Sequence, residues 1–340
     1  MYRKLLHCSI LFGLLSLSDL STALRANPTE GFESFERSSD NSSVDEKVAR
    51  ALKRLDQAKK NYSTGKPKAA KRLLNKIIRK NTESTLVSEA LAMRAQIRMD
   101  DKQWIKSFDD LQLIVDKHPQ YENFDQVIAN QFNCATALME GDRGRIFWIL
   151  PGFKQYSTAV DQFEQIIINA PYGDYAPIAL MNVALTSKKT NNPENSIDAL
   201  DRLINYYPQS TLAPDAYYNL AKTYSDLVKG HQYDQGSTRR AISYYEDFIV
   251  LFPQSDYVGE VEANLKKMEN QLASSRLDLG DFYYYYRNNN TAALVFYNEA
   301  ITIEPKSDAA DEARLRIDDI EKGVRPISNA SLLRKLLGVN

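Results

Sequence analysis

The chain has 340 residues, of which 43% are hydrophobic and 26% are charged, a composition typical of a folded soluble protein and not of a largely disordered one. Its formal net charge of -1 gives no electrostatic reason to expect nucleic-acid binding, which needs a clearly basic surface. The two cysteines, Cys8 and Cys134, cannot build a disulfide framework or a cysteine-rich metal site, and the three histidines lie far apart. We therefore expect no metal and no other cofactor.

The N-terminus is typical of an export signal. An arginine and a lysine lie within the first four residues, and residues 5–17 form an apolar stretch of signal-peptide length, too short to span a bilayer comfortably. We interpret residues 1–26 as a signal peptide and residues 27–43, rich in Ser, Asn and Glu, as a disordered linker. The alternative is the first helix of a cytosolic protein. The absence of acidic residues before Asp19 favours export.

From residue 44 onward the chain has helical patterns in pairs, and the second helix of most pairs ends in a proline-containing turn. These prolines are spaced by 52, 37, 45 and 52 residues, at Pro119, Pro171, Pro208, Pro253 and Pro305. The intervals match the tetratricopeptide unit of roughly 34 residues, lengthened in places by insertions. We predict an all-α fold, an α-solenoid of about six tetratricopeptide-like helix pairs over residues 44–321, followed by a C-terminal capping helix or tail at 322–340.

One predicted helix shows why repeats are needed. Between residues 239 and 252 the apolar side chains recur at intervals of three and four, so they fall on one stripe: Ala241, Tyr245, Phe248, Ile249 and Phe252. Pro253 cannot continue the helix. A helix of this kind cannot bury its stripe alone and must pack on a similar neighbour.

Tyrosine is frequent, with 20 copies that often stand in adjacent pairs or runs. Adjacent helical residues point about 100° apart, so we expect one member of each pair to pack and the other to line a surface for ligands. In the run 282–286 we expect Phe282 and Tyr286 to face the next helix together. The partner-binding candidates from these clusters are Tyr217, Tyr218, Tyr244, Tyr284 and Tyr285.

An insertion at residues 141–153 breaks the repeat. Its glycines and proline forbid a continuous helix, yet its centre is apolar, with Phe147 and Trp148 as further candidates for partner contact. Two interpretations stay open: a loop folded back onto the solenoid, or an exposed hydrophobic contact. The basic amphipathic segment 326–337 likewise either covers the last repeat or docks on a partner.

Catalytic signatures are absent from the sequence. It has no Gly-rich phosphate loop, no GxSxG and no Cys/His pairing, and its carboxylates fall on polar helix faces. Cys134 stands among small residues, where we expect a buried, unreactive thiol. We predict that the protein is not an enzyme.

A longer combination of residues stands in order across positions 205–313. It comprises Asp234-Gln235, Thr238, Ala241, residues 245–249 and 252–257, a long helix through Leu272-Ala273, then Asp281-Phe282-Tyr283, Arg287, Ala292-Ala293 and Glu304-Pro305. In this combination the chain resembles the BamD family, the tetratricopeptide lipoproteins of the bacterial outer-membrane β-barrel assembly machinery. The earlier units match only as tetratricopeptide repeats.

The resemblance implies a non-enzymatic periplasmic scaffold at the inner face of the outer membrane. In the family, the later repeats dock a POTRA domain of the barrel protein BamA, and the earlier repeats receive segments of unfolded outer-membrane proteins. The implied partners are therefore a BamA-like POTRA domain, other assembly subunits and outer-membrane protein segments, and not nucleic acid. By the same resemblance, Arg287 and Phe296 are candidates for partner contact.

Two positions depart from the family pattern. The family is anchored by a lipidated cysteine after a short small-residue motif, whereas Cys8 precedes most of the apolar stretch, so we expect partners to hold the protein at the membrane. The family often has an arginine where Phe296 aligns. Alternative functions are a periplasmic coordinator of peptidoglycan or cell-division machinery, a secreted interaction protein, or an enzyme with a solenoid accessory part. Residues 44–62 are too short for the coiled coil that would favour the first alternative.

Overall fold

The computed structural model describes residues 39–80, 84–142, 145–146, 150–151, 154–228, 230 and 235–324. The chain divides into two units, Met1–Ala49 and Arg50–Asn340, and the first is described only where α1 begins. The helices are α1 Ser39–Ser63, α2 Pro67–Lys80, α3 Ser84–Asp100, α4 Trp104–Lys117, α5 Phe124–Met139, α6 Tyr156–Asn169, α7 Tyr175–Lys189, α8 Pro193–Tyr206, α9 Ala213–Leu227, α10 Gln235–Leu251, α11 Val258–Asp281, a π-helical turn Phe282–Tyr286, α12 Asn290–Ile303 and α13 Asp308–Glu321.

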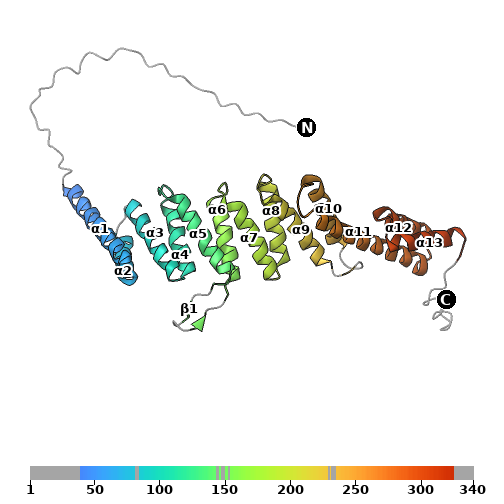
Figure 1. Ribbon diagram of the computed structural model, residues 1–340, viewed down its shortest axis with the longest axis horizontal. Coiled ribbons are helices and arrows are strands. Elements are labelled where there is room, and N and C mark those ends of the chain that lie inside the picture. The colour runs from blue at the N-terminus through green and yellow to red at the C-terminus, as the bar shows by residue number, and fades with distance from the viewer. Residues whose placement is uncertain are drawn as a thin grey trace, which may run out of the picture. The chain divides into compact units, whose positions relative to one another are not determined.

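Within the second unit, α2 to α13 follow one another in chain order along a single row (Figure 1). Each helix from α3 to α12 packs against the helix before it and the helix after it, and contacts beyond the next helix occur between α5 and α7 and between α11 and α13. The predicted all-α solenoid of helix pairs is confirmed: taken two by two, α1 to α12 give six pairs, and α13 follows them.

The second helix of five successive pairs ends two residues before a proline. These helices are α4, α6, α8, α10 and α12, and the prolines are Pro119, Pro171, Pro208, Pro253 and Pro305. The proline ring disfavours the helical conformation for the residue before it. His118 and Ala170 accordingly leave the helical region, with φ near -134° and -142° and positive ψ.

The same prolines set the register of the buried stripe. A small residue lies twelve positions before the proline, a large one eight before and an apolar one five before, and all fifteen are at most 1% exposed: Ser107, Leu111 and Ile114; Ala159, Phe163 and Ile166; Ser196, Leu200 and Leu203; Ala241, Tyr245 and Phe248; Ala293, Tyr297 and Ala300. Each large side chain so buried contributes roughly 1.5–3 kcal/mol. Small residues let neighbouring helices approach closely.

The buried residues form separate clusters along the row. The largest runs from Val87 in α3 to Met268 in α11. A second, at the C-terminal end, is made by Tyr284, Ala293, Tyr297, Ala300 and Ala313, with Leu277 of α11 packed against it. The long helix α11 therefore takes part in two clusters. Among the described residues no helix is both long and apolar enough to cross a membrane.

The insertion between α5 and α6 contains two short strands. β1 (Arg145–Ile146) pairs antiparallel with β2 (Leu150–Pro151), so that Ile146 faces Leu150. This agrees with the expectation that the glycines and proline prevent a continuous helix there. Phe147 and Trp148 lie outside the described residues, and the choice between the two interpretations of this insertion stays open.

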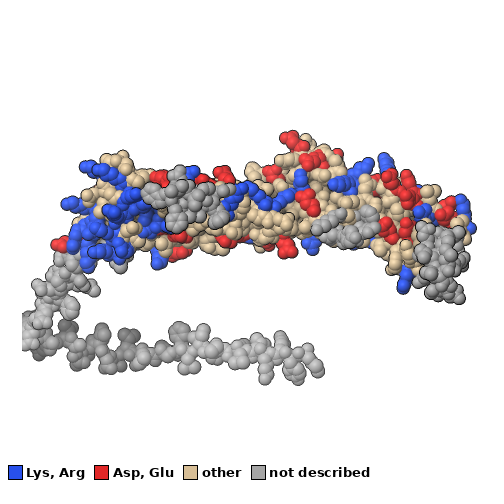
Figure 2. Space-filling view, turned by 90° about the horizontal axis from the view of Figure 1, so that it is seen from below, with Lys and Arg blue, Asp and Glu red and all other residues tan. Residues whose placement is uncertain are grey.

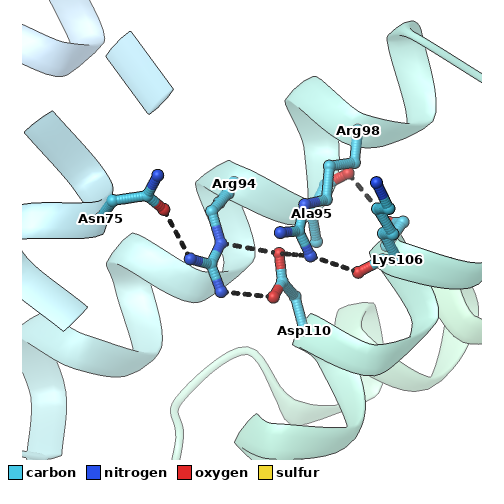
Figure 3. A network of polar contacts seen from close by, with 7 residues as sticks. Asn75, Arg94, Ala95, Arg98, Lys106 and Asp110 are labelled. Atoms are coloured by element: carbon cyan, nitrogen blue, oxygen red, sulfur yellow. Dashed lines mark hydrogen bonds and ion pairs between the residues drawn. The ribbon is translucent and has the colours of Figure 1, made fainter. Parts of the chain in front are cut away.

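A buried carboxylate, that of Asp110, lies at the centre of a polar network among helices α2, α3 and α4. Asp110 of α4 is 1% exposed and accepts two hydrogen bonds from Arg94 of α3, from Nε at 2.9 Å and Nη2 at 2.5 Å. Nη1 of Arg98 lies 2.8 Å from Oδ2 of the same carboxylate and donates to the carbonyl of Lys106. Arg94 also donates to Asn75 of α2 at 2.6 Å, so one network ties α2, α3 and α4 together (Figure 3).

Replacing Asp110 by alanine should lower the free energy of unfolding by about 3–5 kcal/mol, because it leaves two largely buried guanidinium groups without their counter-charge. Urea unfolding followed by circular dichroism measures the change. The matched control is Asp318→Ala, which removes an exposed ion pair with Lys322 and should cost at most about 1 kcal/mol. Equal losses in the two variants would contradict this account of the buried network.

Candidate partner-binding surface

Two of the candidate tyrosines lie together between α9 and α10. Tyr217 meets Tyr244 edge-on with ring centroids 6.4 Å apart, and it meets Phe252 in the same way at 5.6 Å. On its other side Tyr244 stacks on Tyr224 at 5.7 Å, with the two rings nearly parallel. The rings form a continuous aromatic cluster that joins the two helices of one pair, and both candidates are only partly exposed.

Polar groups fix the phenols of this cluster. The Tyr244 hydroxyl donates to Asp201 of α8 at 3.2 Å, and Arg240 donates to the Tyr224 hydroxyl at 2.9 Å. Burial, with the nearby Asp201 carboxylate, raises the pKa of Tyr244 to about 12. Tyr244 is therefore a neutral hydrogen-bond donor at any physiological pH, and its contacts are already made within the chain.

Tyr218 points away from that cluster and is 8% exposed. Its ring stacks on Tyr257 at 4.9 Å, and its hydroxyl donates to Glu260 of α11 at 2.5 Å and accepts from Lys222 at 3.0 Å. Burial and the hydrogen bond to Glu260 raise its pKa. The expectation that one member of each tyrosine pair packs is confirmed here, as it is for Tyr245, which is 1% exposed beside the half-buried Tyr244.

The expectation for residues 282–286 was wrong. Phe282 and Tyr286 stack on each other at 6.0 Å but are 46% and 64% exposed, whereas Tyr284 is 5% exposed and donates to the carbonyl of Val324 at 2.6 Å. The cause is the π-helical turn, which closes between Arg287 N and the carbonyl of Phe282. An i→i+5 turn contains one residue more than an α-helical turn, so it rotates the following side chains to other faces.

The remaining candidates in this part of the chain have different surroundings. Tyr285 is half-buried against Tyr284, with ring centroids 5.1 Å apart. Phe296 lies flat on Tyr283, with centroids 5.3 Å apart, and is partly exposed. Arg287 is exposed. The structure therefore brings Tyr285 and Phe296 to one end of the molecule, separate from the Tyr217–Tyr244 cluster.

The most apolar hollow in this region was not anticipated. It has a volume of about 890 Å³ and opens between the start of α10 and helices α11 and α12; we call it the α11–α12 hollow. Buried Arg276 pairs with Glu299 at 3.1 Å on its wall, and Val295 is 54% exposed. Its lining residues are Arg239, Leu272, Arg276, Thr291, Leu294, Val295, Asn298, Glu299, Thr302 and Ile303.

A second surface missed from sequence lies at two proline turns. Tyr172, beside Pro171, is 99% exposed, and Tyr206, two residues before Pro208, is 73% exposed. Both line two adjoining hollows of about 670 and 340 Å³, which we call the turn hollows. Tyr207 donates to the Pro171 carbonyl at 2.6 Å and so joins the successive turns. Their position next to the prolines, where side chains leave the packed helices, was the signal that could have found them.

The composition of these hollows suits the binding of peptide side chains better than it suits catalysis. They offer aromatic and aliphatic walls with a few polar groups, the usual composition of surfaces that take protein segments. The described part of the chain contains no group of three or more His, Cys, Asp or Glu side chains placed to hold a metal ion. Cys134 is buried in the core, and burial raises the pKa of its thiol to about 11.

The aromatic end of the molecule depends on a close approach at Gly280 of α11. A Cβ built there would lie 2.4 Å from Cε1 of Tyr297, a fully buried ring whose hydroxyl donates to Asp281 at 2.7 Å. Gly280→Ala should therefore destabilise the protein by about 1–3 kcal/mol, although alanine is the better helix former.

Gly259→Ala, in the same helix with open space around the added methyl, is the control and should be neutral or stabilising by up to about 1 kcal/mol. Thermal unfolding of both variants measures the difference. A stabilised Gly280→Ala variant would show that the contact is not tight.

Comparison with known proteins shows a sequence family that the C-terminal half of this chain resembles. Residues 153–318, from just before α6 into α13, match the family model described as YfiO, an outer membrane lipoprotein. The outer membrane protein assembly factor BamD of Rickettsia prowazekii is 28% identical over 135 residues, which are 40% of this chain and 54% of that protein. BamD of Caulobacter vibrioides is 24% identical over 128 residues, 38% and 42% of the two chains. The chain thus spans about half the length of these curated relatives.

Solved structures with a similar arrangement are tetratricopeptide-repeat proteins of low sequence identity. A protein of this type from Parabacteroides merdae is 15% identical, with a TM-score of 0.32 over 77% of this chain and 96% of that one. A thermophilic one from Thermus thermophilus is 14% identical, with a TM-score of 0.29 over 63% and 98%.

The matched interval contains the α11–α12 hollow, the turn hollows and all the described candidate residues. The chain is a BamD-like tetratricopeptide-repeat protein.

Proposed function

We propose that this protein is a non-enzymatic scaffold of outer-membrane protein assembly, exported to the periplasm and held at the inner face of the outer membrane. The observation that carries the proposal is the family match over residues 153–318, together with relatives that are named as outer membrane protein assembly factors. A solenoid suits this role because its repeats present a long surface on which several protein segments can bind side by side.

The α11–α12 hollow is the contact that we propose for a POTRA-bearing, BamA-like barrel protein. Its apolar floor can take aliphatic or aromatic side chains, and the Arg276–Glu299 pair on its wall can orient a polar backbone. Phe296, the candidate position from the resemblance, follows Val295 in the same helix but does not line the hollow; its ring lies on Tyr283.

The turn hollows are the second surface, which we assign to extended segments of outer-membrane proteins. Tyr172 and Tyr206 expose flat rings with hydroxyl groups, and each ring can stack on an aromatic side chain and donate to a peptide carbonyl. Binding of such segments requires many weak contacts and no catalytic group.

Val295→Asp should abolish capture of a POTRA-containing barrel protein in a crosslinked pull-down from envelope extracts, because it places a charge at the mouth of the apolar hollow. Mass spectrometry identifies the recovered proteins. Val250→Asp is the matched control, since Val250 is 77% exposed on α10 and lines none of the hollows described above, and it should retain the partner.

Two results would contradict the proposal at different levels. Recovery of the barrel protein by both variants would remove the α11–α12 hollow from the interface and leave the assembly role in place. Recovery of peptidoglycan-remodelling proteins without any barrel protein would reject the assembly role itself.

A further inference from the structure

The overall charge of the chain hides a strong asymmetry. Residues 50–80 contain twelve Lys and Arg and one acidic residue, Asp56, a net charge of +11. Because the whole chain carries -1, all other residues together carry -12. The basic segment comprises most of α1, all of α2 and the turn between them, and Lys and Arg cover this end of the molecule in Figure 2.

The basic side chains of α2 form an exposed stripe. Lys68, Arg72, Lys76 and Lys80 are four residues apart and all exposed, so they stand one above the other on one face of the helix. The opposite face is buried through Ala70, Leu74 and Ile77. In α1, Lys53 and Lys60 are exposed. Leu52, next to Lys53, is an apolar side chain that is 46% exposed.

Acidic neighbours neutralise only part of this charge. Lys59 pairs with Glu89 at 2.6 Å and Lys71 with Asp101 at 2.6 Å. Lys71 and Lys68 also line a hollow of about 520 Å³ that continues this surface onto the turn before α4 and the start of that helix. There Lys106 adds a positive charge, while Lys102 pairs with Asp142 at 3.1 Å. The surface made by residues 50–80 and this hollow is called the basic face below.

We propose that the basic face is a docking surface for a bilayer of anionic phospholipids. Clusters of Lys and Arg are attracted to anionic headgroups by about 1 kcal/mol for each side chain near the surface. Because the apolar face of α2 is buried in the fold, this docking is electrostatic and uses the Lys/Arg face, with the exposed Leu52 of α1 beside it. The inference stands on charge and exposure, and it does not depend on the assembly role.

The composition of the basic face favours a bilayer over other polyanions. Eight of the twelve basic residues are lysines, whose compact, mobile ammonium groups suit a diffuse array of headgroups more than a fixed bidentate site. Single-stranded nucleic acid is usually held by stacking on exposed aromatic rings. The two aromatic residues of the basic face are only partly exposed: Tyr62 donates its hydroxyl to Asp100 at 2.5 Å, and Trp104 of the hollow packs against the core. A short acidic peptide would reach only a few of the charges on the two helices.

Vesicle co-sedimentation of the full chain tests the proposal. Wild type should partition onto phosphatidylglycerol-containing vesicles and much less onto phosphatidylcholine alone. The difference should vanish when salt rises from about 0.1 to about 1 M, as the screening length falls from about 10 to about 3 Å. The triple variant Lys53→Glu, Lys66→Glu, Lys76→Glu should lose at least about a hundredfold of the partition coefficient.

The matched control is Lys117→Glu, Lys267→Glu, Lys306→Glu, which makes the same change in net charge at exposed positions outside the basic face. It should bind as wild type does, and circular dichroism checks that both triple variants are folded. Equal loss in the control, or no preference for phosphatidylglycerol by wild type, would overturn the proposal. So would patch-dependent binding to polyglutamate or DNA without binding to vesicles.

Discussion

The structure depends on one constraint: each helix carries a buried stripe that only its neighbours in the chain can cover. In five of the six pairs, the proline that follows the second helix fixes where that stripe begins, since a small, a large and an apolar residue stand twelve, eight and five positions before it. Because contacts run mainly between successive helices, the position of every surface hollow follows from the local register of the repeat that contains it.

The residue nine positions before the proline explains several polar and aromatic contacts at once. In three of the five repeats it is Asp110 in α4, Tyr244 in α10 and Phe296 in α12. Each of these three touches the element before its own helix: Asp110 pairs with Arg94, Tyr244 stacks on Tyr224, and Phe296 lies on Tyr283 of the π-helical turn. The position joins the two helices of a pair by an ion pair in one repeat and by stacked rings in others. Tyr244 and Phe296, both candidates for partner contact, thus make contacts within the fold and are also partly exposed.

Helix pairs, turn positions and the packing of one tyrosine per pair could be predicted from the sequence because they follow from proline chemistry and helical period. The π-helical turn could not, since nothing in Phe282–Tyr286 distinguishes it from a continued α-helix, and its extra residue moved Tyr284 into the core. The hollows at Tyr172 and Val295 depend on how neighbouring repeats are offset. The basic face was visible in the sequence but is cancelled in the total charge, so only a segment-by-segment sum finds it.

Helix α11 belongs to two buried clusters, with Met268 in one and Leu277 against the other. In a linear array, such clusters can open separately, and the terminal one has a neighbour on one side only. Hydrogen exchange should then find a less protected unit from the π-helical turn to α13. A ligand in the α11–α12 hollow would touch α10 as well as α12, so it would link the two buried clusters. At a free concentration one hundred times its dissociation constant, the ligand would raise the free energy needed to open the C-terminal cluster by about 2.7 kcal/mol. Partner occupancy would then govern the local order of the C-terminal repeat as well as the composition of the complex.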